Sequence, residues 1–231
     1  MKLSRKIAHF LMVFSTLLLA RLSATEANLE IYTGDKVTPL ESIMGQWAAT
    51  HYDSYPYYYA APESNVDCPP TGMYSLENEA FVMLANDEEK SIGILTAIAM
   101  DSPFLNGSYF PEDTAAKMKE KGVDPKDVMY IGMFLLDPKY SHDEALAFSM
   151  YDKLADLSKG LGKSKICYID MSLPEDHPLR PAVTTSPEPW GEIINGFTTM
   201  DLTVDLSWPT FQTDGSVKNQ THTLLFYIKD L

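Results

Sequence analysis

Asp170 and His177 are candidates for a general-base pair. Asp170 ends the apolar stretch 165–170, which predicts a strand, and His177 follows in the next loop. Active-site groups often lie at strand ends and in the loops beyond them, and an imidazole exchanges protons near neutral pH. The alternative interpretation is that Asp170 caps a turn and that His177 is an exposed loop residue. The sequence leaves both interpretations open.

A second candidate site is the turn between a predicted strand at residues 130–136 and the long predicted helix that follows. In an α/β protein such a turn places a helix N-terminus beside a ligand, and the ligand is often a phosphate. This turn contains no glycine. Ser141 and Glu144 have the spacing of a capping box, in which two side chains satisfy the first N–H groups of the helix. Asp143 and Glu144 also offset the helix dipole that attracts an anion.

The other residue patterns give little support to a metal site or to a hydrolase. The sequence contains neither the G-x-S-x-G motif nor the G-x-x-x-x-G-K-[ST] phosphate loop. The histidines show no zinc-like spacing with each other or with cysteine, and they include His51, His142, His177 and His222. We therefore predict no metal.

The N-terminus has the pattern of a secretory signal peptide. Basic residues precede an apolar stretch at residues 7–20, and small residues around Ala27 suit a signal peptidase. The apolar stretch is shorter than the roughly 20 residues of a spanning helix. We predict a signal peptide at residues 1–27, a single domain at residues 28–231 and a secreted or periplasmic protein. Arg21 weakens the cleavage region, so an uncleaved membrane anchor is the alternative.

The charge of the chain limits its partners. The net charge is −14, and loss of residues 1–27 would remove four basic residues and one acidic residue, which gives −17. Such a surface repels nucleic acid and anionic membranes, and it suits neutral or basic soluble partners. Cys68 and Cys167 are the two cysteines. An exported chain could pair them, but Cys167 in a predicted buried strand could equally pack as a free thiol.

The order of predicted elements indicates an α/β fold with a mixed sheet. A strand at 29–33 and a helix at 39–51 precede a tyrosine-rich segment at 52–71. A hairpin with a charged turn, a short helix and the strand, helix and strand around the turn described above come next. The chain closes with a short helix and two β stretches. The predicted ranges of these later elements are 80–86, 91–100, 111–122, 130–136, 146–161, 165–170, 190–195, 197–208 and 221–229.

These elements resemble the GNAT acyltransferase superfamily over residues 29–231. The resemblance rests on five stretches. Four of them are the strand 132–136 with its trailing Pro-x-Tyr, the helix that runs to Gly162, the Ile-Ile-Asn-Gly-Phe at 193–197 and the last strand at 224–229. The fifth, at 177–181, resembles a bacterial subgroup. The resemblance implies a mostly antiparallel sheet of about six to seven strands flanked by helices, with splayed central strands.

In that superfamily the pantetheine arm of acetyl-CoA lies between the splayed strands, and its pyrophosphate sits in the following loop. The resemblance thus places Phe134, Leu135 and Leu136 along the arm. It places the pyrophosphate at Ser141, His142, Asp143, Glu144, Ala145 and Leu146. The usual loop pattern [QR]xxGx[GA] falls on Ser141, Glu144 and Leu146, and all three depart from it.

The resemblance also suggests where acid and base groups would lie. Glu192 stands at the spacing where many members carry a tyrosine acid, and Met133 stands where the subgroup often carries an acid. The implied function is transfer of an acetyl group from acetyl-CoA to a small-molecule or protein amine. The alternative is an exported protein that keeps the fold, lacks turnover and binds a partner, for example through Tyr57, Tyr58 and Tyr59. The oligomeric state is not predicted.

Overall fold

The computed structural model describes residues 27–51, 60, 73–171, 196–212 and 214–231. His177, Glu192, Cys68 and the tyrosines at 57–59 therefore lie outside the described residues.

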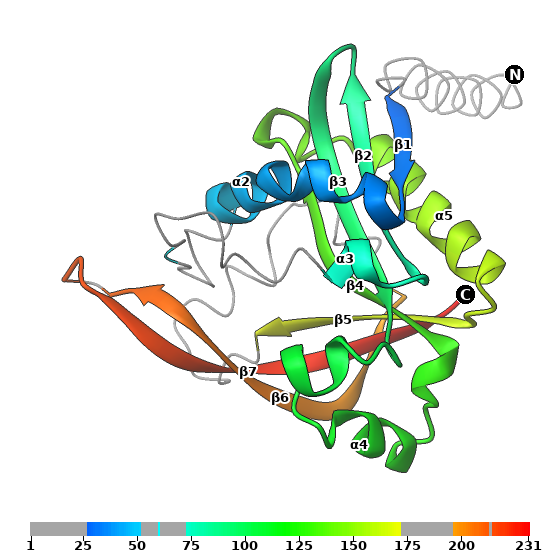
Figure 1. The fold of residues 1–231 in the computed structure, drawn as a ribbon, viewed down its shortest axis with the longest axis vertical. Helices are drawn as coiled ribbons and strands as arrows, with labels where there is room; N and C mark the ends of the chain where they lie inside the picture. Colours follow the sequence, from blue (N-terminus) through cyan, green and yellow to red (C-terminus); the bar gives the residue numbers. More distant parts are fainter. Residues whose placement is uncertain (1–26, 52–59, 61–72, 172–195, 213) are drawn as a thin grey trace, which may run out of the picture.

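A seven-stranded sheet forms the centre of the molecule (Figure 1). Its order is β1-β2-β3-β4-β5-β7-β6, and every neighbouring pair is antiparallel except β4 and β5. The strands are β1 Asn28–Tyr32, β2 Ala80–Asp87, β3 Lys90–Ala99, β4 Val128–Leu136, β5 Lys165–Met171, β6 Thr198–Phe211 and β7 Val217–Asp230. The predicted α/β class and mixed sheet are confirmed.

Helices cover both faces of the sheet. They are α2 Glu41–His51, α3 Met73–Leu76, α4 Thr114–Glu120 and α5 Glu144–Gly160. The apolar side chains of α5 pack on one face, whereas α2, α3 and α4 contribute to a second core on the other. Strand side chains alternate between the two cores, as the pleat requires. Within the described ranges, no helix has both the length and the apolar character needed to span a membrane.

The two central strands pair over only part of their length. β4 and β5 are joined at three register pairs, which end at Tyr130 and Cys167. Beyond these residues β4 continues to Leu136 and β5 to Met171, and the strands diverge (Figure 1). We call the region where β4 and β5 no longer pair with each other the β4–β5 split. Cys167, at its base, is a buried free thiol, and burial raises its pKa.

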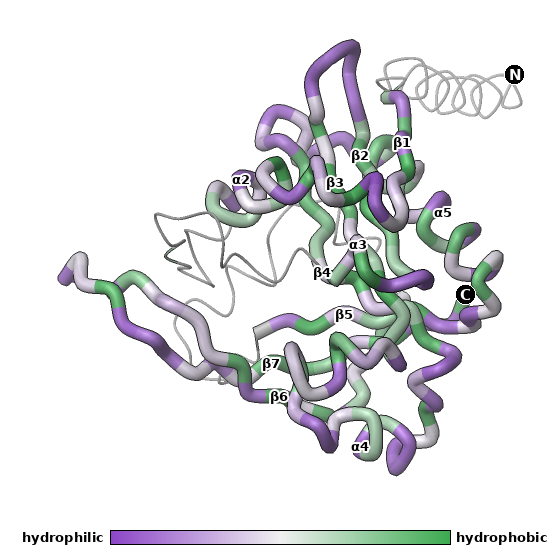
Figure 2. The backbone as a smooth tube through the Cα atoms, in the orientation of Figure 1, coloured by the Kyte–Doolittle hydropathy of each residue, from purple (hydrophilic) through white to green (hydrophobic). Residues whose placement is uncertain are grey.

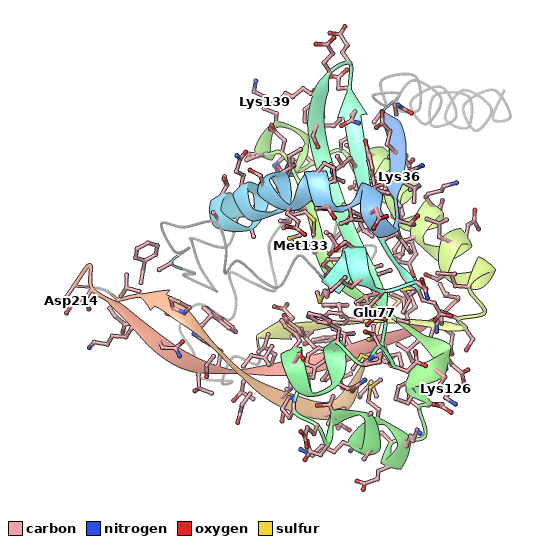
Figure 3. All side chains as sticks on the ribbon, viewed as in Figure 1. Lys36, Glu77, Lys126, Met133, Lys139 and Asp214 are labelled. Atoms are coloured by element: carbon pink, nitrogen blue, oxygen red, sulfur yellow. The ribbon has the colours of Figure 1, made fainter. Side chains whose placement is uncertain are left out.

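A β-bulge interrupts β4 at the start of the split. Thr96 of β3 faces Met133 and Ala97 faces Ile131, so Gly132 is the extra residue. The Met133 N–H donates to Thr96 Oγ1 at 2.9 Å, and that hydroxyl donates to Tyr74 Oη at 3.0 Å. The bulge turns the buried Met133 side chain into the core that contains Tyr74, away from α5. Figure 3 labels Met133 in the middle of the sheet.

The end of the sheet opposite the split is fixed by a buried lysine. Lys163 Nζ lies 2.6 Å from the Glu79 carboxylate and 3.6 Å from that of Asp101, and it donates to the Lys126 carbonyl at 3.0 Å. These partners lie at the ends of β2, β3 and β4. The lysine therefore ties the first residues of β5 to three other strands.

The terminal hairpin is longer than the sequence predicted. The segment 209–220 was expected to be a loop, but β6 extends to Phe211 and β7 begins at Val217. Thr210 Oγ1 lies 3.0 Å from His222 Nε2, and the His222 ring stacks on Trp208 at 3.9 Å. These contacts between β6 and β7 stabilise the paired strands in a segment whose sequence is polar. Pro209 is tolerated because β6 is an edge strand. At the other end of β6, Asp201 has φ +49 at a register shift.

Candidate functional site

The β4 side of the split presents backbone carbonyl groups. The Asp137 N–H donates to the Ile92 carbonyl of β3 at 2.8 Å. Because a trans peptide points its C=O opposite to its N–H, the Leu136 carbonyl faces the β5 side. The bond from the Met133 N–H to Thr96 turns the Gly132 carbonyl to the same side. The end and the start of the unpaired β4 segment therefore direct acceptors toward the split.

His51, at the C-terminal end of α2, contacts the end of this segment. Its Nε2 lies 3.0 Å from the Leu136 carbonyl, and its Nδ1 lies 2.9 Å from the Trp47 carbonyl. The ring stacks on Trp47 at 4.8 Å between centroids. Both contacts are carbonyl acceptors, so a neutral ring donates to one of them and an imidazolium donates to both. His51 thus contacts one of the carbonyl groups to which an extended ligand could bond.

The loop after β4 is anchored to the tip of the β2–β3 hairpin. Lys90 Nζ lies 2.6 Å from Asp137 Oδ2, and Asp137 Oδ1 accepts from the Lys139 N–H at 3.0 Å. These bonds hold the pKa of Asp137 below its usual range. Tyr140 Oη donates to Asp87 at 2.8 Å, which raises the pKa of Tyr140. Figure 2 shows that this tip is hydrophilic, and Figure 3 labels Lys139 beside it.

The first turn of α5 satisfies N–H groups from within its own loop. The Asp143 carboxylate accepts from the Leu146 N–H at 3.0 Å and is the N-cap of the helix. The Asp143 N–H donates to the Tyr140 carbonyl at 2.9 Å, and the Ala147 N–H donates to the Asp143 carbonyl at 3.1 Å. The N-terminus of α5 is therefore closed by a carboxylate of this chain.

The predicted capping box is wrong in its residues. Ser141 was expected to cap α5, but it follows the short turn Pro138–Tyr140, and its hydroxyl donates to the Pro138 carbonyl at 2.9 Å. Asp143 replaces it because the helix begins at Glu144, two positions later than the box requires. The Glu144 N–H donates to the His142 carbonyl at 3.1 Å. The expectation that the turn satisfies its own N–H groups is retained with a different capping residue.

These residues do not fit a bound pyrophosphate. A pyrophosphate needs N–H groups that point outward from a positive helix end, and glycine lets its oxygens approach the backbone. Here the Leu146 N–H is bonded to a carboxylate, and Asp143 and Glu144 place negative charge at the helix end. Lys90, which lies near the loop, is paired with Asp137. Binding of acetyl-CoA by this chain stays a prediction.

The structure brings most of the predicted cofactor residues to one end of the sheet. Phe134 is buried, and Leu135 and Leu136 are partly buried, on β4 beyond Tyr130. The loop and first helical turn that contain residues 141–146 follow directly. Asp170 lies on β5 beyond Cys167 and is partly buried. In the pairing of β5 with β7, it stands opposite Leu225. The structure does not test its proposed partnership with His177.

An aromatic cluster lies beside the β5 side of the split. Tyr168 stacks on Tyr227 at 5.0 Å between centroids, and Phe197 meets Tyr168 edge-on at 5.0 Å. Lys229 Nζ lies 4.9 Å from the centroid of Tyr151, whose pKa burial raises to about 12. Burial, followed by the Asp170 carboxylate, raises the pKa of Tyr168. Tyr151 and Tyr168 therefore stay protonated at neutral pH.

His51 is the site residue that the sequence did not reveal. Its spacing from Trp47 predicts that the two rings share one face of a helix, and this part was readable. Its contact with Leu136 joins residues 85 positions apart, and no local pattern indicates it. Among the described residues, no group of three or more histidine, cysteine, aspartate or glutamate side chains could hold a metal ion.

Solved structures with a similar architecture are acetyltransferases or related enzymes. A probable acetyltransferase from Staphylococcus epidermidis ATCC 12228 has a TM-score of 0.51 and 10% identity, over 88% of this chain and 98% of that one. An acetyltransferase of the GNAT family from Streptococcus pneumoniae has a TM-score of 0.46 and 8% identity, over 88% and 100%. FeeM, an N-acyl amino acid synthase from uncultured soil microbes, has a TM-score of 0.48 and 12% identity, over 89% and 92%. No family model and no curated protein matches the chain.

The chain shares its fold with the probable acetyltransferase. The alignment with this chain covers 98% of the probable acetyltransferase. The sheet has the mixed strand directions and the splayed central strands that the resemblance implied. At identities near one in ten, this likeness concerns the fold and not the substrate.

Proposed function

We propose that this chain is an N-acyltransferase of the GNAT type, which moves an acyl group from a thioester to an amine. The observation that carries the proposal is the β4–β5 split, where parallel pairing stops at Tyr130 and Cys167 while both strands continue. An extended thioester arm can add to the edge of a strand where two neighbouring strands diverge. The Leu136 and Gly132 carbonyls face that side.

The reaction requires two proton transfers. The amine nitrogen attacks the thioester carbonyl, the C–S bond breaks, a base takes the ammonium proton, and the thiolate gains a proton as it leaves. Asp170, His177 and Glu192 are our candidates for these roles. Asp170 is the one that the structure describes, on the β5 side of the split. The net charge of −14 favours a neutral or basic amine acceptor over nucleic acid. We also propose that residues 1–27 direct export.

The test is acyl transfer with Asp170 altered. The purified chain is incubated with S-acetyl thioesters and a panel of amines, and mass spectrometry measures the amide formed. We expect Asp170→Asn to reduce the rate by about a hundredfold, the range of a positioned acid or base. Asp152→Asn, an exposed change on α5 with the same loss of charge, should leave it unchanged. Absence of amide above the uncatalysed rate with every thioester would contradict the proposal.

A binding role without turnover is the second candidate. The specific observation in its favour is the closed N-terminus of α5, where Asp143 takes the Leu146 N–H. In this case no thioester should bind, and a partner recovered by the wild-type chain should be lost when Tyr57, Tyr58 and Tyr59 become alanine. Saturable binding of any acyl thioester would argue against this candidate.

A further inference from the structure

We propose that Asn219 is the attachment site of an N-linked glycan, whose first sugar packs on Phe211 and Val217. The proposed export of the chain underlies this assignment, because the transfer takes place in a secretory pathway. There the amide nitrogen of Asn219 bonds to the anomeric carbon of an oligosaccharide that is carried on a lipid pyrophosphate. The bond from that carbon to the pyrophosphate breaks, the pyrophosphate keeps the electron pair, and a base of the transferase takes one proton from the nitrogen.

The acceptor motif lies on β7. Asn219-Gln220-Thr221 has the spacing Asn-x-Ser/Thr that the transferase requires, with no proline at the middle position. All three residues are exposed. Within the part of the chain that the structure describes, the Asn219 side chain has no hydrogen-bond partner. A glycan on its nitrogen therefore breaks no hydrogen bond of these residues.

A second copy of the motif, Asn106-Gly107-Ser108, differs in this respect. The Asn106 Nδ2 donates to the Met100 carbonyl and to the Ser102 carbonyl, both at 3.1 Å. A glycosylated nitrogen keeps a single hydrogen, so at least one of these bonds would be lost. The sugar would also have to lie at a partly buried position, where the Asn106 Oδ1 is buried. The fold thus accepts a glycan at Asn219 and opposes one at Asn106.

An exposed apolar pair lies beside Asn219 on the same face of the hairpin. Phe211 of β6 stands opposite Val217 of β7, and Pro209 stands opposite Asn219. Side chains two residues apart on a strand share a face, so Val217 and Asn219 point to the same side. Phe211 is the diagonal neighbour of Asn219 across the two strands. Phe211 is 45% exposed and Val217 is 52% exposed, so they offer a sugar an apolar surface to cover.

The first sugar of a glycan at Asn219 would reach this pair. One face of a pyranose ring presents C–H groups, and its burial against an aromatic ring removes apolar surface of both from water. The rest of the glycan has room, because the hairpin extends away from the centre of the sheet (Figure 1), and Figure 3 labels Asp214 at its tip. The glycan would therefore cover two apolar side chains that the described residues leave exposed.

Expression of the full chain, with its own residues 1–27, in eukaryotic cells that secrete into the medium tests the site. Mass spectrometry of the secreted chain, before and after digestion with a peptide N-glycosidase, locates the glycan. We expect a glycan at Asn219 in most molecules, and Asn219→Gln should abolish it. A secreted chain without this glycan, or with a glycan at Asn106 alone, would overturn the proposal.

Failure of export is a separate outcome. If the chain stays in the cell with residues 1–27 attached, the proposed export is wrong. These residues are then replaced by a signal peptide of established activity, and the same measurement at Asn219 decides whether the glycan is attached.

Two matched variants separate the motif from the fold. Thr221→Ala removes the hydroxyl that the motif requires, and it also removes the contact with Ser207, whose hydroxyl oxygen lies 2.8 Å from that of Thr221. Ser207→Ala removes the same contact and leaves the motif intact. We expect Thr221→Ala to lose the glycan and Ser207→Ala to keep it. Equal glycan occupancy in the two variants would contradict the role of the motif.

Melting temperatures test the contact with Phe211. An endoglycosidase trims the glycan to its first sugar, and the peptide N-glycosidase removes it completely. The trimmed wild type should melt about 2 °C above the chain without glycan, and Phe211→Ala should abolish this difference. Removal of the glycan converts the asparagine to aspartate in both chains, so this change cancels in the comparison. Absence of the difference in the wild type, or its persistence in Phe211→Ala, would overturn the contact.

Discussion

Replacing Gly132 with alanine should destabilise the protein through one specific clash. A Cβ at Gly132 would lie 1.9 Å from Tyr74 Oη and 2.9 Å from Thr96 Oγ1. Tyr74 is 3% exposed and Thr96 is fully buried, so neither side chain can move into solvent. The Tyr74 hydroxyl must move by about 1 Å or more, which breaks its bond from Thr96.

The size of the effect follows from these contacts. Overpacking a buried site costs about 1–3 kcal/mol, and loss of one hydrogen bond costs about 1 kcal/mol. The reduced freedom of the unfolded chain returns about 0.4–1 kcal/mol when glycine becomes alanine. We therefore expect Gly132→Ala to lower the free energy of unfolding by about 1–3.5 kcal/mol. Urea unfolding followed by circular dichroism measures this change.

A double-mutant cycle identifies the clash. Tyr74→Phe removes the hydroxyl and leaves the ring Cζ 3.2 Å from the new Cβ. The double variant should therefore be more stable than the sum of the single effects predicts, by about 1–2 kcal/mol. Gly160→Ala, where nothing lies within 4 Å of a new Cβ, is the control and should not destabilise. Additive effects in the cycle, or a wild-type stability for Gly132→Ala, would refute this account of the bulge.

Three further predictions concern charged and titratable groups. Lys163→Met should lower stability by about 2 kcal/mol in urea, because the ammonium is buried, whereas Lys117→Met breaks an exposed pair and should cost under about 0.5. Lys90 depresses the pKa of Asp137, so the stability from this pair is present above the ordinary aspartate pKa and is lost as pH falls through the folded value. Asp137→Asn should therefore reduce the fall of the melting temperature between pH 5 and pH 2. Identical profiles of melting temperature against pH for the variant and the wild type would contradict this. Burial lowers the pKa of His222, so stability should fall as pH drops below about 6.5. His222→Phe should remove that slope from the melting curves, and an unchanged slope would exclude the role of this ring.

The parts of the fold that depend on local sequence could be predicted. The charged turn between Asp87 and Lys90 gave the β2–β3 hairpin its correct position. The apolar spacing of Leu146, Met150 and Leu154 predicted the buried face of α5. Each of these features depends on neighbours within a few residues, so the pattern alone determines them.

The parts that depend on distant contacts could not. The Gly132 bulge changes the alternation of β4, and the hydroxyl groups that bond there come from Tyr74 on α3 and Thr96 on β3. Period-two counting would place Met133 on the same face as Ile131, whereas the bulge places them on opposite faces. The cap of α5 is Asp143 and not Ser141, because Ser141 ends the short helical turn Pro138–Tyr140 and the helix begins only at Glu144.

The outer edge of β6 bears on how the protein behaves at high concentration. An edge strand offers backbone groups that can pair with a second molecule and extend the sheet. Here the left-handed backbone at Asp201 bends the strand near one end, and Pro209 withholds an N–H near the other. Uninterrupted pairing along this edge is therefore confined to residues 202–208. The same two residues that shape the hairpin therefore limit the length of edge that a second molecule could extend.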